Sequence, residues 1–402
     1  MTNSALYIVS ASYPFGKGEE FVQKELVELS KYFDKIYLFP LTCLGKQRWL
    51  PDNVELNLSL ANTSRLIEKK QFLLDFFLLA KILLLELMNS GKKSFILSNI
   101  RELFNSILQT HNLAKVFSTQ IKEKKNIYFY STWMNDGALM LAILKEKGLI
   151  PHFVFRLHGY DLFDDRRKGN YMPFRYFNFK NASKIFILSK AGLEYIMAKN
   201  IFPQKLILSY FGTYDHGINA YNKNEIFTIV SCSNVIRLKR IDKIIQTLSH
   251  VDFPLHWIHF GDGELMHEIK NLALTLPSHV AFEFKGHTSN EEVLEFYQKN
   301  SVNLFMHLSD TEGFGVAIVE AQSFGIPALA VKTGGVPEIV NETTGILILL
   351  DKKPEQIADL VYEFKTSAMN SKEYQKLVKQ HWQLNFEAVK NYGYFYEKIV
   401  EN

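Results

Sequence analysis

The sequence predicts an α/β protein with two doubly wound domains, each built on a parallel β-sheet with helices on both faces. The first observation is that short, nearly all-apolar runs alternate with segments of helical periodicity, which is typical of parallel sheets buried on both faces. The second is that this alternation starts again near residue 226. A chain of 402 residues with 47% hydrophobic composition is long enough for two cores. We therefore expect a first domain over residues 1–210, a second over 211–380, and a closing helix over 381–402.

The first half of the chain contains five short apolar runs that predict buried strands. They are ALYIVSA (5–11), KIYLFPL (35–41), NIYFYST (126–132), HFVFRLHG (152–159) and KIFILSK (184–190). After the first run, the glycine loop PFGKGEE (14–20) leads into FVQKELVELSKYF (21–33), whose apolar residues repeat at helical spacing.

The second half repeats the same organisation. Its predicted strands are IFTIVSCS (226–233), LHWIHFGDG (255–263), VAFEFKG (280–286), VNLFMHLS (302–309), PALAVK (327–332) and TGILILL (344–350). Helices are predicted over 241–251 and 315–325, the latter with Gly325 as its C-terminal stop. In such sheets ligands bind beyond the carboxyl ends of the strands, and a cleft between two domains is a common site.

One segment, residues 71–88, is almost wholly apolar but carries Asp75, Lys81 and Glu86. Each charge costs about 2.5–3.5 kcal/mol at the centre of a bilayer, so the segment is a poor transmembrane span. Two alternatives stay open: a helix buried in the first domain, or a helix lying on an anionic membrane surface. The segment is flanked by Lys69, Lys70, Lys92 and Lys93.

The charge of the chain is divided unequally between its halves. Residues 1–210 carry about 29 Lys and Arg against about 18 Asp and Glu, whereas residues 211–402 carry about 17 against about 24. The basic half suggests an anionic partner such as a membrane surface or a phosphorylated acceptor; nucleic acid ranks last because no nucleic-acid motif is present. Cys43 and Cys232 have no metal-ligand spacing, and the start of the chain does not read as a signal peptide, so we expect a cytoplasmic protein.

The stretch TEGFGVAIVE places Glu312 and Glu320 on either side of a glycine turn that follows a predicted strand. Gly313 and Gly315 let the backbone approach a ligand closely, and the helix that begins near Val316 directs unpaired N–H groups and its positive dipole end at the same place. This arrangement suits a phosphate, whereas a carboxylate beside it suits hydroxyl groups. The pattern therefore predicts a nucleoside diphosphate sugar, with Glu312 on the sugar and Glu320 on the ribose.

This stretch also resembles the signature of family-4 glycosyltransferases, in which two glutamates are separated by seven residues and Gly-Phe-Gly (Gly313, Phe314, Gly315) follows the first. Seven other segments resemble the family in the same order along the chain. They are YPFGKGEEFV (13–22), FRLHGYDLF (155–163), SCSNVIRLKRIDKII (231–245), FGDGELMHEI (260–269), FKGHTSNEEVLEFYQ (284–298), PALAVKTGGVPEIVNETTGILI (327–348) and HWQLNFEAVKNYGYFYEKI (381–399). The resemblance implies the GT-B architecture, with two Rossmann-like domains and a C-terminal helix that crosses back to the first. It also implies similarity to bacterial enzymes of capsule, exopolysaccharide and surface-antigen biosynthesis.

The resemblance implies roles for residues that match the family pattern. His158 faces the reacting sugar, Lys239 neutralises the donor phosphates, and Glu312 holds sugar hydroxyls, so these three are the expected catalytic residues. Asp161 either orients His158 or caps the following helix.

Further donor-binding residues are expected on loops at the ends of strands. They are Gly16, Asn234, Arg237, Gly286, His287, Gly313, Phe314, Gly315 and Glu320. Asn234 stands where the family commonly has an arginine, so one guanidinium is missing; we expect Arg237 to supply the charge, with Arg240 as the alternative. Lys17 and Gly18 extend the loop of Gly16.

The resemblance therefore implies a hexosyltransferase that retains anomeric configuration and uses no cofactor. No Asp-x-Asp motif lies between the domains, so we also expect no metal. The expected substrates are a nucleotide diphosphate sugar and a glycan acceptor carried on a membrane lipid, at the inner face of the cytoplasmic membrane. Two alternatives remain: a GT-B protein that binds nucleotide sugar without turnover, and a sugar phosphorylase. A phosphorylase of this shape usually needs a lysine for pyridoxal phosphate, and no candidate motif is present.

Overall fold

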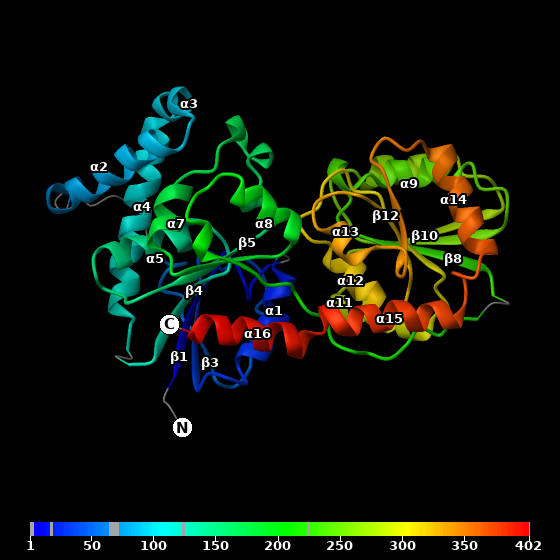
Figure 1. Ribbon diagram of the computed structural model, residues 1–402, viewed down its shortest axis with the longest axis horizontal. Helices are drawn as coiled ribbons and strands as arrows, with labels where there is room; N and C mark the ends of the chain where they lie inside the picture. The colour runs from blue at the N-terminus through cyan, green and yellow to red at the C-terminus, as the bar shows by residue number, and fades with distance from the viewer. Residues whose placement is uncertain (1–3, 17–18, 64–71, 123–124, 223–224, 402) are drawn as a thin grey trace. The chain divides into compact units, whose positions relative to one another are not determined.

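A computed structural model of the protein describes residues 4–16, 19–63, 72–122, 125–222 and 225–401. The chain forms two compact units: unit 1 comprises Met1–Tyr210 and Tyr392–Asn402, and unit 2 comprises Phe211–Asn391. Each unit contains one parallel β-sheet with helices packed against it (Figure 1). The predicted α/β class, with two doubly wound domains, is confirmed.

The sheet of unit 1 has seven strands in the order β3-β2-β1-β4-β5-β6-β7, and all neighbouring strands are parallel. The strands are β1 (Ala5–Ser10), β2 (Lys35–Pro40), β3 (Val54–Leu56), β4 (Ile127–Ser131), β5 (Val154–Leu157), β6 (Lys184–Ile187) and β7 (Leu206–Leu208). All six residues of β1 are buried, as expected for a central strand covered on both faces. The five apolar runs predict the five inner strands; the two three-residue edge strands were not predicted.

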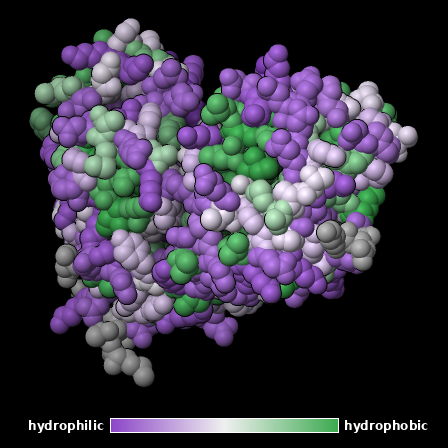
Figure 2. Space-filling view, turned by 45° about the vertical axis from the view of Figure 1, so that its right-hand side comes forward, coloured by the Kyte–Doolittle hydropathy of each residue, from purple (hydrophilic) through white to green (hydrophobic). Residues whose placement is uncertain are grey.

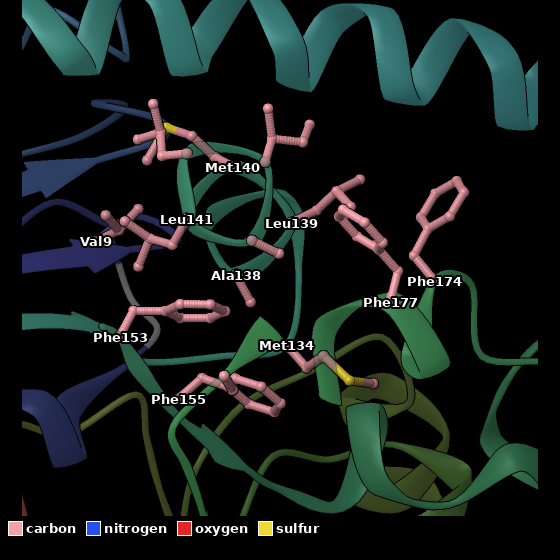
Figure 3. Close-up of a cluster of buried hydrophobic side chains, with 14 of the residues drawn as sticks. Val9, Met134, Ala138, Leu139, Met140, Leu141, Phe153, Phe155, Phe174 and Phe177 are labelled. Atoms are coloured by element: carbon pink, nitrogen blue, oxygen red, sulfur yellow. The ribbon is translucent and has the colours of Figure 1, made fainter. Parts of the chain in front are cut away.

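The core of unit 1 is centred on α5, in which eight consecutive residues are buried. Its side chains lie against phenylalanines of β5 and of the α7 region (Figure 3). The helices of the unit are α1 (Glu20–Leu29), α2 (Phe72–Asn89), α3 (Lys93–Ser98), α4 (Ile100–Thr119), α5 (Asp136–Glu146), α6 (Gly159–Leu162), α7 (Arg175–Asn181), α8 (Lys190–Met197) and most of α16 (Ala388–Val400). Short 3-10 turns occur at Asp164–Arg166, Lys168–Asn170 and Pro203–Lys205.

Helix α2 contains most of the apolar segment over which the sequence left two alternatives. It packs against α4 and α7 through Leu79 and Ile82, which are fully buried, but Phe77 is 81% and Met88 67% exposed. The helix is therefore buried in unit 1 along one side and accessible along the other, so it combines a feature of each alternative. No helix among the described residues is long and apolar enough to cross a membrane. In the space-filling view, hydrophobic patches interrupt a largely hydrophilic surface (Figure 2). The flanking Lys69 and Lys70 lie outside the described residues.

The sheet of unit 2 has six parallel strands in the order β10-β9-β8-β11-β12-β13. The strands are β8 (Phe227–Cys232), β9 (Leu255–Phe260), β10 (Val280–Gly286), β11 (Leu304–His307), β12 (Ala328–Val331) and β13 (Gly345–Ile348). The helices are α9 (Ile241–Leu248), α10 (Met266–Ala273), α11 (Asn290–Lys299), α12 (Val316–Ser323), α13 (Val336–Ile339), α14 (Pro354–Thr366) and α15 (Lys372–Phe386), with a 3-10 turn η5 at Arg237–Lys239. All six strand predictions for this half are confirmed, and Gly325 follows α12 with a φ of 76°.

Helix α16 carries the chain from unit 2 back into unit 1, since its residues from Tyr392 onward cluster with unit 1. The ring of Phe395 lies 4.1 Å from the guanidinium carbon of Arg156, measured to the ring centroid. Arg156 is itself fully buried and forms an ion pair of 2.9 Å with Glu25. The closing helix is thus part of the unit 1 core.

Candidate functional site

The central feature of unit 2 is a contact between Lys239 and Glu312, which the sequence predicts to act on one ligand. Lys239 Nζ lies 2.6 Å from Glu312 Oε2, and His307 Nε2 lies 3.1 Å from the same oxygen. His307 is the last residue of β11, and Lys239 is the last residue of η5, which follows β8. The ends of two neighbouring strands therefore bring the three side chains together.

Backbone contacts explain why Lys239 reaches Glu312. The N–H of Asp310 donates to the carbonyl of Leu238 at 3.0 Å, which joins the turn after β8 to the loop after β11. Arg240 completes this join through ion pairs with Asp310 (3.0 Å) and Asp242 (3.1 Å). Arg240 is thus committed to the scaffold of the site.

The electrostatics of Glu312 follow from its burial, from the ammonium of Lys239 and from the hydrogen bond with His307. Burial alone would raise the pKa of Glu312, but the ammonium of Lys239 and the hydrogen bond from His307 hold that pKa well below its usual range. The side chains of Lys239 and Glu312 are only 19% and 16% exposed, so water screens the pair weakly. Glu312 is therefore an ionised acceptor of hydrogen bonds at neutral pH.

The loop after β12 fixes the backbone of Glu312. Gly334 has a φ of 50°, and a Cβ atom added there would lie 1.7 Å from the carbonyl oxygen of Glu312. Thr333 Oγ1 donates to the carbonyl of Asp310 at 3.2 Å. Only glycine allows this approach, so the two loops act as one surface.

The Gly-Phe-Gly turn leads from Glu312 into α12. Gly315 adopts a φ of 111° directly before Val316, the first residue of the helix. Phe314 is buried, with its ring 5.7 Å from that of Phe386. The phenylalanine anchors the turn between Glu312 and α12.

Glu320 lies apart from Glu312 in its contacts. It is 6% exposed and accepts a hydrogen bond of 2.8 Å from Asn290, the first residue of α11. Gly286, with a φ of 68°, ends β10, and the exposed His287 begins the loop that leads to α11. The hydrogen bond thus joins Glu320 to the helix that follows the loop on which the sequence places the nucleotide base.

The two remaining candidates near Lys239 are both exposed. They are Asn234 and Arg237. Among the described residues no ion pair is recorded for Arg237, in contrast to Arg240. Arg237 is therefore the arginine whose charge is available to replace the guanidinium that the family pattern has at position 234.

In unit 1, His158 follows β5 and is buried between aromatic rings. Its ring centroid lies 4.0 Å from that of Trp133 and 4.7 Å from that of Phe21. Burial and the positive charge of Arg156 hold the pKa of His158 well below its ordinary value. The imidazole is therefore neutral at pH 7.

Asp161 fixes the backbone next to His158. Its carboxylate accepts hydrogen bonds from the N–H of His158 (2.6 Å) and from the N–H of Met134 (2.8 Å), so it caps α6 and ties the loop after β4 to it. Burial raises the pKa of Asp161 to about 6 against the lowering effect of these hydrogen bonds. Gly16, with a φ of 70°, lies in the loop after β1, whose Lys17 and Gly18 lie outside the described residues.

Unit 1 also contains a pocket of about 210 Å³ after the carboxyl end of β2. The lining residues include Leu41, Thr42, Leu60, Gln109, Leu113 and Asp136.

Sequence reasoning missed His307, Asn290 and Trp133. A single histidine in an apolar strand usually belongs to the core, but its place at the last position of β11 puts it beside the loop of Glu312. A polar residue near the carboxyl end of a predicted strand is thus the sequence signal that could have identified His307. Among the residues that the structure describes, no group of three or more His, Cys, Asp or Glu side chains could hold a metal ion.

Comparison with known proteins relates part of the chain to a family. Residues 216–381 match the family model described as "Glycosyl transferases group 1". The resemblance predicted from the sequence is thereby confirmed for this segment, which contains Lys239, His307 and Glu312. A search of curated proteins found no match.

Solved structures share the fold over nearly the whole chain. Anabaena Alr3699/HepE in complex with UDP has a TM-score of 0.67 at 14% identity, covering 99% of this chain and 100% of that chain. The lipopolysaccharide outer core galactosyltransferase WaaB has a TM-score of 0.68 at 14% identity, covering 98% and 99%. Sucrose-phosphate synthase from Thermosynechococcus elongatus has a TM-score of 0.73 at 13% identity, covering 98% of both chains. At these identities the likeness establishes the GT-B fold.

Proposed function

We propose that this protein is a glycosyltransferase that moves a hexosyl group from a nucleoside diphosphate sugar to a hydroxyl of a glycan acceptor. The observation that carries the proposal is the contact between Lys239 and Glu312 at 2.6 Å, inside the segment that matches the group 1 model. A cation for phosphate and a carboxylate for hydroxyls lie within reach of one small molecule. The complexes of HepE with UDP and with UDP-glucose are in line with such a donor.

In this proposal the ammonium of Lys239 exchanges its contact with Glu312 for a contact with the donor diphosphate. The N-terminus of α12 presents further N–H groups after Gly315. Together they would stabilise the charge that develops on the leaving diphosphate, so we propose that no metal ion and no cofactor takes part. Arg237 would add a second positive charge near Asn234.

Glu312 is proposed to position the sugar. Its oxygens accept hydrogen bonds from Lys239, His307 and the N–H of Gly313 (3.2 Å). When the donor has engaged Lys239, His307 and the N–H of Gly313 still hold the carboxylate, which is better suited to orient hydroxyl groups than to attack the anomeric carbon. We therefore propose retention of configuration by a front-face substitution, in which the leaving diphosphate accepts the proton of the acceptor hydroxyl.

The rest of the donor would extend toward Glu320. Its contact with Asn290 suggests that the two side chains share the ribose hydroxyls, with the base beside Gly286 and His287. In unit 1, the neutral His158 would donate a hydrogen bond to a sugar hydroxyl, and the loop of Gly16 would face the donor or the acceptor.

We further propose that the acceptor is a lipid-linked glycan of surface polysaccharide biosynthesis and that the protein works at the inner face of the cytoplasmic membrane. Exposed apolar side chains of α2 and α3 support this, and Lys92 and Lys93, at the junction of the two helices, are exposed as well. The apolar side chains are Phe76, Phe77, Leu84, Met88 and Leu97.

Vesicle sedimentation tests the membrane contact. We expect binding to anionic vesicles at low salt that weakens at high salt, and loss of binding in Phe77→Ser/Leu84→Ser. Leu349→Ser, which changes a 61% exposed leucine of unit 2, is the control and should bind like the wild type. Absence of wild-type binding at low salt would remove the membrane from the proposal.

The transfer activity is tested by the release of nucleoside diphosphate from a panel of donors, with and without glycan acceptors. Glu312→Ala should lose most transfer while remaining folded, and Glu363→Ala, an exposed residue of α14, should not. Full activity of Glu312→Ala would refute the assignment.

The same assay separates the second candidate, a protein that binds nucleotide sugar without turnover, which the replacement at Asn234 favours. Such a protein would be stabilised thermally by a donor but release no diphosphate with any acceptor. Phosphate-dependent formation of a sugar phosphate would instead indicate a phosphorylase.

A further inference from the structure

We propose that Glu19 is a positioning residue for the reaction: its carboxylate holds the loops around His158 in place and thereby sets the rate of transfer without touching the donor. The inference rests on the proposed function for its kinetic part. Glu19 precedes α1 in a left-handed conformation, with a φ of 57°, and its side chain is 9% exposed.

One oxygen of Glu19 binds the loop after β1. Oε2 accepts hydrogen bonds from the N–H of Ser12 (2.5 Å), the hydroxyl of Ser12 (3.1 Å) and the N–H of Tyr13 (2.7 Å). The N–H of Ala11 donates to the other oxygen, Oε1, at 3.1 Å. Three consecutive backbone N–H groups thus converge on one side chain.

The oxygen Oε1 also binds the loop after β4. It accepts a hydrogen bond from Trp133 Nε1 at 2.7 Å and from Thr132 Oγ1 at 3.2 Å. Glu19 therefore joins the ends of two adjacent strands and the start of α1, at the carboxyl edge of the sheet where ligands bind in this kind of fold.

These contacts converge on His158. Trp133, whose indole binds Glu19, has its ring centroid 4.0 Å from that of His158. The ring of Phe21, two residues after Glu19, also contacts the imidazole of His158, with the centroids 4.7 Å apart. The next residue of the same loop, Met134, donates to Asp161, which also accepts from the N–H of His158. Displacement of the Glu19 carboxylate would therefore move the aromatic walls of His158.

The chemistry of the contacts requires a carboxylate. Among the described residues, all six recorded hydrogen bonds to the Glu19 side chain come from N–H or O–H donors, and no ion pair to Glu19 is recorded. An ionised carboxylate accepts at both oxygens, whereas an amide of the same shape presents an NH₂ group to one of the two sets of donors. Glu19→Gln is thus a change of hydrogen bonding with little change of volume.

The test compares Glu19→Gln with Glu20→Gln, which removes the same charge from the neighbouring exposed residue. We expect Glu19→Gln to lower kcat at least tenfold while Kd for the nucleoside diphosphate changes less than twofold, because the proposed contacts to the nucleotide and its phosphates lie in unit 2. In protein labelled with 5-fluorotryptophan, the ¹⁹F resonance of Trp133, assigned with Trp133→Phe, should shift in Glu19→Gln and stay in place in Glu20→Gln.

A wild-type kcat in Glu19→Gln, or a loss of kcat accompanied by shifts of all four tryptophan resonances, would overturn the proposal, the latter because it indicates general unfolding. Failure of the proposed function is distinguishable. In that case the wild type itself transfers no sugar, and the Trp133 resonance alone decides whether Glu19 holds this loop.

Discussion

Replacement of Lys239 by methionine should lower the free energy of unfolding. A double-mutant cycle with Glu312→Gln can measure how much of this loss comes from the Lys239–Glu312 ion pair. The ammonium is 2.6 Å from the carboxylate, and both side chains are less than one-fifth exposed. Removal of Lys239 leaves an ionised carboxylate in a mostly buried position, with the His307 side chain as its remaining side-chain donor. Glu312→Gln in turn leaves the mostly buried ammonium of Lys239 without its carboxylate partner.

The expected magnitude follows from this geometry. Hydrogen bonds between charged groups contribute about 1.5–3 kcal/mol, and loss of one partner of a buried pair costs about 3–5 kcal/mol. Because the pair retains some contact with water, we expect each single variant to lose about 2–3 kcal/mol. The double variant should lose less than the sum of the two, with a coupling energy of about 2 kcal/mol.

The assay is denaturant unfolding of the wild type, the two single variants and the double variant at pH 7 and at lower pH. The pKa of Glu312 in the folded protein lies below its unfolded value of about 4.3, so the contribution of the pair is present above that value and is lost as pH falls through the folded pKa. In Lys239→Met the burial of Glu312 is no longer opposed by the lysine, so this variant should gain stability relative to the wild type as the solution is acidified. If the losses of unfolding free energy in the two single variants add up to the loss in the double variant within about 0.5 kcal/mol, Lys239 and Glu312 do not interact, and the description of the site that depends on their contact is refuted.

Three further predictions concern the surroundings of the two candidate centres. His307→Leu should raise the donor KM about tenfold, because Glu312 loses a charge-assisted hydrogen bond, whereas His307→Gln keeps an N–H and should stay closer to the wild type; equal KM values for the two variants would contradict this. Since the pKa of Asp161 rises to about 6 on folding, its contribution to stability is present below about pH 4 and is lost as pH rises through 6, so the unfolding free energy of the wild type relative to Asp161→Asn should fall by about 3 kcal/mol across this range; a flat difference would count against it. Gly334→Ala should destabilise the protein by about 1–3 kcal/mol more than Gly148→Ala, because both glycines have positive φ but only Gly334 has a backbone atom in the place of the added Cβ; similar melting curves would show that the loop yields.

The fold could be predicted because its signal is repeated along the chain. Each inner strand is a short apolar run, and burial on both faces demands that composition. The edge strands β3 and β7 have three residues each, all only partly buried, so they carry no such pattern. Helix α2 is apolar on its exposed and buried sides alike, and its sequence therefore could not say which face packs against α4 and α7.

The candidate site could be predicted where its chemistry is local in sequence. Glu312 and the glycines beside it are neighbours, and Lys239 was placed by resemblance. His307 and Glu19 could not be found this way, because their roles depend on contacts with groups from other loops. Glu19 in particular accepts hydrogen bonds from nearby backbone N–H groups and from the indole of Trp133, which is more than a hundred residues away in sequence. Every residue type except proline has a backbone N–H, so such donors cannot be recognised from the sequence.

The path of α16 has a consequence for biosynthesis. Unit 2 is one continuous stretch of chain inserted between two pieces of unit 1. A ribosome therefore delivers all of unit 2 before it delivers the residues that place Phe395 over the buried Arg156. Unit 1 therefore begins to be synthesised first but is completed second, and until α16 has left the ribosome the buried Arg156 lacks the aromatic ring that covers it in the folded protein.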